Sequence, residues 1–267
     1  MRFVIISDTH GLHQELELPE GDILIHAGDF CGHYGEIDAW DFLEWFSDQD
    51  FQHKIFISGN HDFIAADSPE EFESKIPPGI IYLNDSGVEI NGLNFWGSPV
   101  QPGLVGWAFG KRRGEEIKKH WDIIPPDVDV LITHTPPCGI LDESTSFQSL
   151  GCEQLSERMF FLSPFVHIFG HVHASYGLEK HNGIVYINGS NVETDGGLVN
   201  EPIVFDLDRE GRFSLIGPWF QPGTIEFKTG TSFRYIHTWI AQQTKVITAM
   251  ANKAPLSPCT FIPRTVK

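Results

Sequence analysis

Five segments of the sequence repeat one layout, in which a short apolar, β-branched run ends in a small residue and is followed by polar side chains. The segments cover residues 2–10, 22–30, 54–62, 128–137 and 165–173. Each apolar run has the length of a strand, and uniformly apolar runs are typical of strands buried on both faces. Because polar residues follow every run, we expect them to gather at one edge of a sheet, where α/β proteins bind ligands.

Helical patterns lie between some of these strands. Residues 36–49 carry an apolar stripe, residues 68–76 place Pro and Glu early, and residues 152–162 show a further apolar pattern. Each of the three predicts a helix. The strand–helix–strand order of residues 2–58 favours a parallel α/β half.

Short strands dominate the middle and later chain. Residues 80–99 predict a meander of three strands with turns at Asn-Asp-Ser-Gly and Asn-Gly. Residues 183–190 and 202–216 predict further strands, the last two joined by a turn at 209–211. Two mixed sheets packed together fit this pattern better than one open sheet. We therefore predict an α/β (α+β) fold, a four-layer α-β-β-α sandwich of two mixed sheets flanked by helices.

Charge divides the 267 residues into two parts. Residues 1–217 carry 35 acidic and 12 basic side chains, whereas residues 218–267 carry one acidic and six basic side chains. We interpret residues 1–217 as the functional domain and residues 218–267 as a basic C-terminal extension of unknown role. The extension could pack on the acidic body, bind a protein partner or stay mobile. Residues 232–253 could form a helix, although they show no clean apolar stripe.

The overall charge limits the class of partner. A formal net charge of −18 argues against a general nucleic-acid partner, because a phosphate backbone would be repelled over most of the surface. A small anionic substrate remains compatible if metal ions reverse the field in one cleft.

Cysteine content and hydropathy indicate the compartment. The four cysteines, at positions 31, 138, 152 and 259, have no CxxC spacing, which predicts reduced thiols. No apolar run approaches the roughly 18 residues of a membrane span, and a first strand starting near Arg2 leaves no room for a signal peptide. We therefore expect a cytoplasmic protein without a membrane partner, and the sequence leaves the oligomeric state open.

The polar residues that follow the five apolar runs form a donor set typical of metal centres. They are Asp8, His10, Asp29, Asn60, His134, His171 and His173, with His61 and Asp62 beside them. Imidazoles suit Zn, Fe, Mn and similar ions, and carboxylates suit harder ions. Any one Asp could serve a turn or an N-cap. The whole set exceeds the needs of one ion with open positions and suits two ions that share a bridging carboxylate.

The other eight histidines lack this context. His26 and His167 lie inside predicted strands, where we expect them to be core or face residues.

The donor residues also form five blocks in a fixed order: DTH, GD, GNHD, a lone His and GHVH, between residues 8 and 173. In these blocks the sequence resembles the calcineurin-like metallophosphoesterases. The connecting stretches GDILIHAGDF, LITHTPPCG and YINGSN are also similar to a narrower branch, the small metallophosphoesterase-domain proteins. Animal members of that branch are expressed in brain and act weakly on cyclic nucleotides. The resemblance extends to about Leu207.

The resemblance implies two divalent ions, with Mn²⁺ first and Fe, Zn, Co, Ni or Mg as alternatives. It assigns Asp8, His10 and His173 to the first ion, Asn60, His134 and His171 to the second, and Asp29 to both. It further implies that a hydroxide between the ions attacks phosphorus in line with the leaving oxygen. His61 would stabilise the transition state or protonate that oxygen, and Asp8 would orient His61. Asn60, His61 and Asn191 would contact substrate.

The implied activity is metal-dependent phosphodiester hydrolysis, with 3′,5′-cyclic nucleotides as the first candidate substrates. A nucleotide-binding or regulatory protein with weak turnover, or a phosphomonoesterase or nuclease, are the alternatives. Some animal members have Gly at the position of His171, a loss associated with weak catalysis, so His171 favours an enzyme. Trp107 and Phe109 could stack a nucleobase near the cleft or pack in the core.

Overall fold

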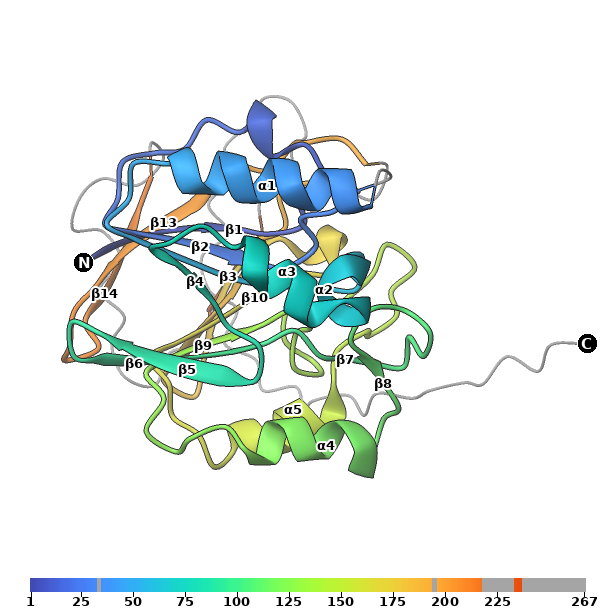
Figure 1. The fold of residues 1–267 in the computed structure, drawn as a ribbon. Helices are drawn as coiled ribbons and strands as arrows, with labels where there is room; N and C mark the ends of the chain where they lie inside the picture. The colour runs from blue at the N-terminus through green and yellow to red at the C-terminus, as the bar shows by residue number, and fades with distance from the viewer. Residues whose placement is uncertain (33–34, 194–195, 218–232, 237–267) are drawn as a thin grey trace, which may run out of the picture.

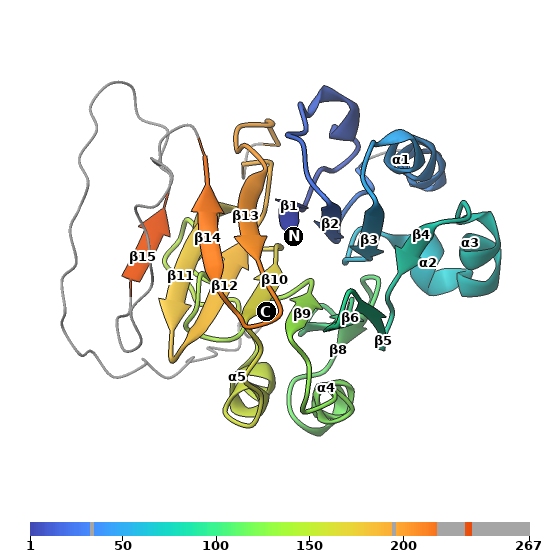
Figure 2. The same ribbon diagram turned by 90° about the vertical axis from the view of Figure 1, so that its left-hand side faces the viewer.

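Two large β-sheets lie face to face, with helices on both outer faces (Figures 1 and 2). The computed structural model describes residues 1–32, 35–193, 196–217 and 233–236. The predicted four-layer α-β-β-α sandwich is confirmed.

The first sheet contains the parallel half that the sequence predicts. Its order is β14-β13-β1-β2-β3-β4. The strands are Arg2–Ile6 (β1), Ile23–Ala27 (β2), His53–Ile57 (β3), Ile80–Tyr82 (β4), Ile203–Leu207 (β13) and Phe213–Ile216 (β14). β1 to β4 pair in parallel, whereas β13 and β14 are antiparallel to their neighbours.

The second sheet has a parallel centre and antiparallel edges. Its order is β15-β11-β12-β10-β9-β6-β5. The strands are Ser86–Ile90 (β5), Leu93–Ser98 (β6), Val130–Thr133 (β9), Val166–Phe169 (β10), Gly177–His181 (β11), Ile184–Asn188 (β12) and Phe233–Ile236 (β15). A separate short ribbon pairs β7 (Gln101–Pro102) with β8 (Gly110–Lys111).

Three of the helices match the predicted ranges. The helices are Glu36–Asp48 (α1), Phe63–Asp67 (α2), Pro69–Lys75 (α3), Glu115–Asp122 (α4) and Glu153–Met159 (α5), with short 3₁₀ turns at His13–Glu15 (η1) and His173–Ser175 (η2). Our predictions omit α4 and β11. Both are rich in charged residues, and only tertiary packing of a few apolar side chains, such as Trp121 on α4, reveals them.

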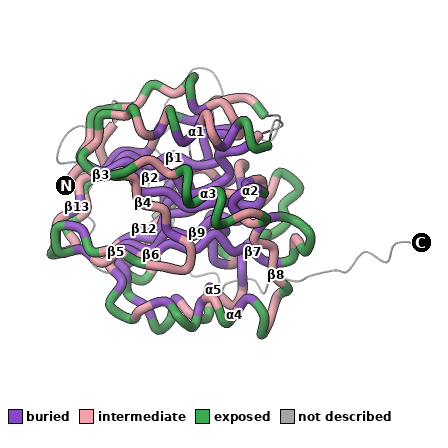
Figure 3. Tube along the Cα trace, in the orientation of Figure 1, coloured by how far each residue is buried: buried purple, intermediate pink, exposed green. Residues whose placement is uncertain are grey.

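Side chains alternate between the two faces of each strand, and the buried side chains form three hydrophobic cores between the layers. On β1, Phe3 and Ile5 pack between the two sheets, while Val4 and Ile6 pack toward α1. A third cluster under α4 and α5 includes Trp121. Figure 3 shows the buried strands between the exposed outer surfaces of the helices. The strands are thus buried on both faces, as their apolar runs predict.

The predicted meander over residues 80–99 is wrong in its connectivity. The three strands exist, but β4 pairs in parallel with β3 in the first sheet, whereas β5 and β6 form a hairpin in the second. The Asn91-Gly92 turn of that hairpin has positive φ at both residues, as the dipeptide predicts. The chain changes sheets at 83–85, a step that the strand pattern does not reveal.

Two expectations for the cysteines and the extension also need correction. Cys138 is disulfide-bonded, so the prediction that all four thiols are reduced is wrong. Cys31 and Cys152 are free and buried, and burial raises the pKa of both thiols. In the extension, residues 233–236 form a strand paired with β11, in place of the start of a helix. The rest of 218–267 lies outside the described residues.

His26 and His167 are fully buried in β2 and β10, as predicted. The Nε2 atom of His26 lies 3.0 Å from Thr9 Oγ1, and that of His167 lies 2.8 Å from Thr133 Oγ1. Burial lowers the pKa of each imidazole to about 3, from an ordinary 6.5. Each ring is therefore neutral in the folded protein over the whole physiological range.

These rings should make the metal-free protein sensitive to acid. Below pH 6.5 the unfolded chain takes up a proton on each imidazole that the folded chain accepts only near pH 3. The free energy of unfolding should therefore fall by about 1.4 kcal/mol per pH unit for each ring as pH decreases. His167→Gln should lower this slope by that amount in urea unfolding between about pH 7 and 5. His181→Gln, on half-buried His181, is the control, and an equal slope in both variants would contradict the expectation.

Candidate metal centre

The seven predicted ligands meet at the carboxyl ends of strands from both sheets. Three groups of side chains place their donor atoms within 4.8 Å of one another: Asp8, His10 and His173; Asp29, His134 and His171; and His10, Asp29 and His61. The strand order explains the meeting, because β1, β2 and β3 are neighbours in one sheet and β9 and β10 are neighbours in the other. Asn60 joins the second group through its side-chain oxygen, 3.1 Å from His134 Nε2.

Asp29 lies between the other two groups. Its Oδ2 atom is 3.3 Å from His134 Nε2 and 3.9 Å from His10 Nε2, and the two histidines belong to different groups. The other oxygen, Oδ1, accepts the backbone N–H of His61 at 2.8 Å. One carboxylate oxygen thus faces both groups while the second is held by the main chain.

Backbone carbonyls orient two of the rings. His10 Nδ1 is 3.1 Å from the Cys31 carbonyl, and His134 Nδ1 is 2.9 Å from the Ala27 carbonyl. A proton on each Nδ1 leaves the Nε2 lone pair directed at the centre, which is the usual second contact of a metal-binding histidine. His10 Nε2 then faces His173 Nε2 at 3.3 Å. Facing lone pairs at this distance fit a shared cation.

The charges of the centre support the same interpretation. Burial alone would raise the pKa of Asp8, but the hydrogen bond and charge of His173 hold it well below its usual range. Burial would lower the pKa of His134, but the charge of Asp29 raises it to about 9. Without ions, the carboxylates are therefore ionised and balanced by protonated imidazole. Divalent cations can replace these protons, so the donor set fits two ions.

The backbone at the centre is strained. Asp8, His10, Asp29 and His171 have φ between +45° and +69°, a region that non-glycine residues avoid. Such strain persists where surrounding contacts impose it, and it gathers at functional sites. Close approach also fixes Gly170, because a Cβ atom there would clash with the Asp8 carboxylate and Ser7 Oγ. The glycine of the GHVH block is thus required by the neighbouring DTH block.

His61 lies at the edge of the centre and is half-buried. Its ring is 4.6 Å from that of His10 and 5.0 Å from that of Trp107, both edge to face. Burial lowers the pKa of His61 in the metal-free protein, and the charge of Asp29 opposes that effect. A ring nitrogen of His61 lies within 4.8 Å of the donor atoms of His10 and Asp29, so the side chain can reach a group bound at the centre.

Asp62 joins the loop after β3 to the loop after β2, a role that the sequence pattern does not predict. One oxygen accepts the backbone N–H groups of Asp29 at 3.0 Å and Gly59 at 2.7 Å, and the other accepts that of Cys31 at 2.9 Å. Burial and the Asp29 charge raise the pKa of Asp62 to about 8, against the lowering effect of these donors. The fourth letter of GNHD marks the residue, but from the sequence it is only a candidate for a turn or an N-cap.

Asp62→Asn should reduce turnover about 10- to 100-fold, the usual effect of losing a partner behind a metal ligand. An amide keeps the size of the side chain but cannot accept all three N–H groups. Steady-state kinetics and bound-metal analysis will test this, with Asp67→Asn at the end of α2 as the matched control. Full activity of Asp62→Asn would exclude the positioning role.

The loop after β12 supports Asp8. Ser190 Oγ donates to Asp8 Oδ2 at 2.6 Å, and the His171 N–H lies 3.0 Å from both Asp8 oxygens. Asn191, predicted to contact substrate, lies directly after Ser190. It is fully buried, its Oδ1 accepts the Ser7 N–H, and its amide donates to the Asn200 carbonyl. These contacts join the end of β1 to this loop through Asn191, and its contact with substrate stays a prediction.

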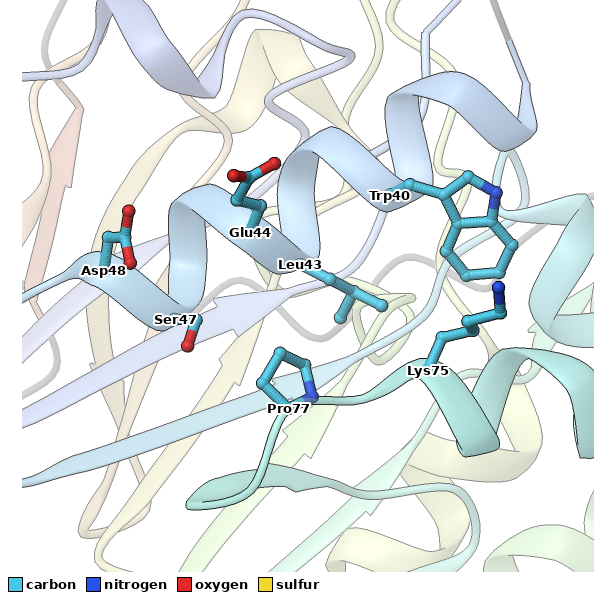
Figure 4. A pocket seen from close by; sticks show the side chains of 7 residues that line it. All are labelled: Trp40, Leu43, Glu44, Ser47, Asp48, Lys75 and Pro77. Atoms are coloured by element: carbon cyan, nitrogen blue, oxygen red, sulfur yellow. The ribbon is translucent and has the colours of Figure 1, made fainter.

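A groove on the outer surface contains none of the predicted ligands. It has a volume of about 350 Å³ and lies between α1 and α3 (Figure 4). Its lining consists of Trp40, Leu43, Glu44, Ser47, Asp48, Lys75 and Pro77. Lys75 Nζ lies 5.6 Å from the centre of the Trp40 ring, a cation–π contact that joins the two helices. We interpret the groove as the seam of that helix packing.

Comparison with known proteins agrees with this geometry. The sequence model of the family described as calcineurin-like phosphoesterase matches residues 1–175. The chain belongs to this family. The calcineurin-like phosphoesterase fold and its dinuclear divalent metal site follow, as does metal-dependent phosphoesterase activity.

Individual relatives define the branch. Metallophosphoesterase domain-containing protein 1 of Homo sapiens is 37% identical over 230 residues, which cover 77% of this chain and 71% of the relative. A UPF0046 protein of Caenorhabditis elegans is 32% identical over 223 residues, covering 79% of this chain and 76% of the relative. The predicted resemblance to small metallophosphoesterase-domain proteins is thereby confirmed. Within the described ranges, none of the helices is long and apolar enough to cross a membrane.

Proposed function

We propose that this calcineurin-like phosphoesterase hydrolyses phosphodiesters, with 3′,5′-cyclic nucleotides as the first candidate substrates. The observation that carries the proposal is the single Asp29 carboxylate between two donor groups, with His61 beside it. The similarity to the narrower branch supports the choice of cyclic nucleotides. A half-buried imidazole at the edge of the centre supports hydrolysis of alkyl phosphoesters, because an alkoxide leaving group needs a proton.

The donor groups define the residues that would hold the ions. Asp8, His10 and His173 would bind one ion; Asn60, His134 and His171 the other; Asp29 both. When bound, two divalent ions supply positive charge for the phosphate and an activated water at neutral pH. Mn²⁺ is our first candidate, since mixed N and O donors suit it, and Fe, Zn, Co, Ni and Mg are alternatives.

His61 would act at the leaving oxygen. In hydrolysis, one P–O bond to the incoming water oxygen forms and the bond to the ester oxygen breaks. The departing oxygen takes a proton, which His61 would supply, since its ring nitrogen lies within 4.8 Å of the donor atoms of His10 and Asp29. The backbone N–H of His61 to Asp29 fixes the main chain of the loop, so the ring keeps its place relative to the centre.

Metal reconstitution tests the proposal. The protein is stripped with chelator and supplied separately with Mn²⁺, Mg²⁺, Zn²⁺ or Ni²⁺. Each form is assayed with bis-p-nitrophenyl phosphate, p-nitrophenyl phosphate, 2′,3′-cyclic AMP and 3′,5′-cyclic AMP. We expect Mn²⁺ to restore hydrolysis of the diesters, including 3′,5′-cyclic AMP.

Each other outcome has a defined meaning. Turnover of the monoester alone would indicate a phosphomonoesterase. Nucleotide binding without turnover would indicate a regulatory protein of this fold. The assignment to diesters fails in both cases.

The compartment and the partners stay predictions. A cytoplasmic location loses part of its support, because the Cys138 disulfide is uncommon in reducing compartments. A protein partner for the basic residues 218–267 is supported by the contrast with the acidic body, and the same acidity argues against nucleic acid.

A further inference from the structure

An aromatic pair flanks the centre at His61. The Trp107 ring is 5.0 Å from the His61 ring and 6.0 Å from the Phe63 ring. Trp107 is 43% exposed and Phe63 is 41% exposed, so both rings offer apolar surface to solvent beside the proposed proton donor. The two rings are adjacent and lie beside His61, so they form a small apolar patch at the centre, and such patches mark binding sites.

Backbone hydrogen bonds fix the main chain that carries both rings. Phe63 is the first residue of α2, two residues after His61, and its N–H donates to the His61 carbonyl at 3.0 Å. Trp107 ends a turn in which its N–H donates to the Leu104 carbonyl at 3.0 Å, with Gly106 at φ +97°. A type II turn requires this positive φ at its third residue. Trp107 is thus held by a defined turn.

Phe109 differs from Trp107, although the sequence offers both as stacking residues. Its side chain packs against the core cluster between the first sheet and α1. The Phe109 carbonyl also accepts the Gln101 N–H at 3.3 Å, which anchors the loop to β7. Phe109 therefore anchors the loop to the core, whereas the Trp107 side chain is exposed to solvent.

We propose that Trp107 and Phe63 form a binding wall for a planar aromatic group of the substrate, such as a nucleobase or an aryl ester. The position of the wall gives the reason. His61 would protonate the leaving oxygen, and Trp107 contacts His61, so the organic group bonded to that oxygen lies nearest to the wall. This inference rests on the proposed function. It adds that Trp107 and Phe63 determine which phosphodiesters the protein prefers as substrates.

Binding of two probes to the Mn²⁺-loaded protein separates the wall from the metal centre. AMP carries a base and ribose 5-phosphate does not, while both carry the phosphate. By calorimetry, Trp107→Ala should weaken AMP binding about tenfold, as expected for loss of one stacked base, and ribose 5-phosphate binding less than about twofold. Trp107→Phe should restore most of the AMP affinity. With bis-p-nitrophenyl phosphate, Trp107→Ala should raise KM about tenfold and change kcat little.

Phe160→Ala removes an exposed aromatic ring at the end of α5 and is the control for general effects. Equal weakening of both probes, or of neither, in Trp107→Ala would overturn the wall. Metal-dependent hydrolysis without the contrast between probes would leave the proposed function standing and refute the wall. The contrast without any hydrolysis would support the wall and refute the proposed function.

Discussion

Replacing His171 with glycine is expected to lower the turnover of a phosphodiester at least about a hundredfold while changing the free energy of unfolding by less than about 1 kcal/mol. Loss of a partner behind a ligand already costs up to about a hundredfold, and His171 is a proposed ligand itself. The fold should tolerate the change because His171 has φ +69°, where glycine is unstrained. The N–H of residue 171 that contacts Asp8 belongs to the main chain and is retained.

Bound manganese, turnover and urea unfolding should be measured on the same preparation. Asn182→Gly is the matched control, since Asn182 also has positive φ, at +50°, but lies on the turn between β11 and β12, away from the centre. We expect His171→Gly to lose metal affinity and turnover, and Asn182→Gly to lose neither. Unchanged turnover in His171→Gly would exclude His171 from the second ion.

Replacing His61 with asparagine should affect substrates according to their leaving groups. Turnover of 3′,5′-cyclic AMP should fall about 10²- to 10⁴-fold, because its alkoxide departs poorly without a proton. Turnover of bis-p-nitrophenyl phosphate should fall much less, because nitrophenolate leaves without one. The N–H contact from residue 61 to Asp29 is a backbone contact and persists in the variant.

The pH dependence gives a second measure of the same role. A proton donor must carry its proton, so turnover of the cyclic nucleotide should decline as pH rises in the wild type and lose that decline in His61→Asn. Metal content serves as the control for an intact centre. Equal losses with both substrates would show that His61 acts through binding and not through proton transfer.

The part of the metal centre that could be predicted consists of the residues that come directly after strands. The apolar runs predict the strands β1, β2, β3, β9 and β10. Because neighbouring parallel strands end at the same edge of a sheet, the polar residues that follow these strands lie close together. The seven donors could therefore be named from the sequence. The supports of the centre were not predictable in the same way. Ser190 reaches Asp8 across 182 residues, and no local pattern marks a serine for that contact.

Some residues have two roles that are equally compatible with the sequence, and only tertiary contacts show which role each residue has. Asn191 follows Ser190 directly, yet its amide is used by two backbone groups. Trp107 and Phe109 share one loop and one residue class, but only packing against α1 and the first sheet separates them. The change of sheet after β4 was unpredictable for a similar reason. Hydrophobic alternation identifies a strand, but it does not specify the strands with which that strand pairs.

The contact between Asp8 and Ser190 limits when the nascent chain can assemble the metal centre. The DTH segment leaves the ribosome well before the serine that holds its aspartate, and before β13, which completes the flank of β1. At about 5–20 residues per second, roughly 10–40 s of synthesis separate the aspartate from the serine. The nascent chain therefore cannot assemble the centre early, and acquisition of its ions reports that the domain has been finished.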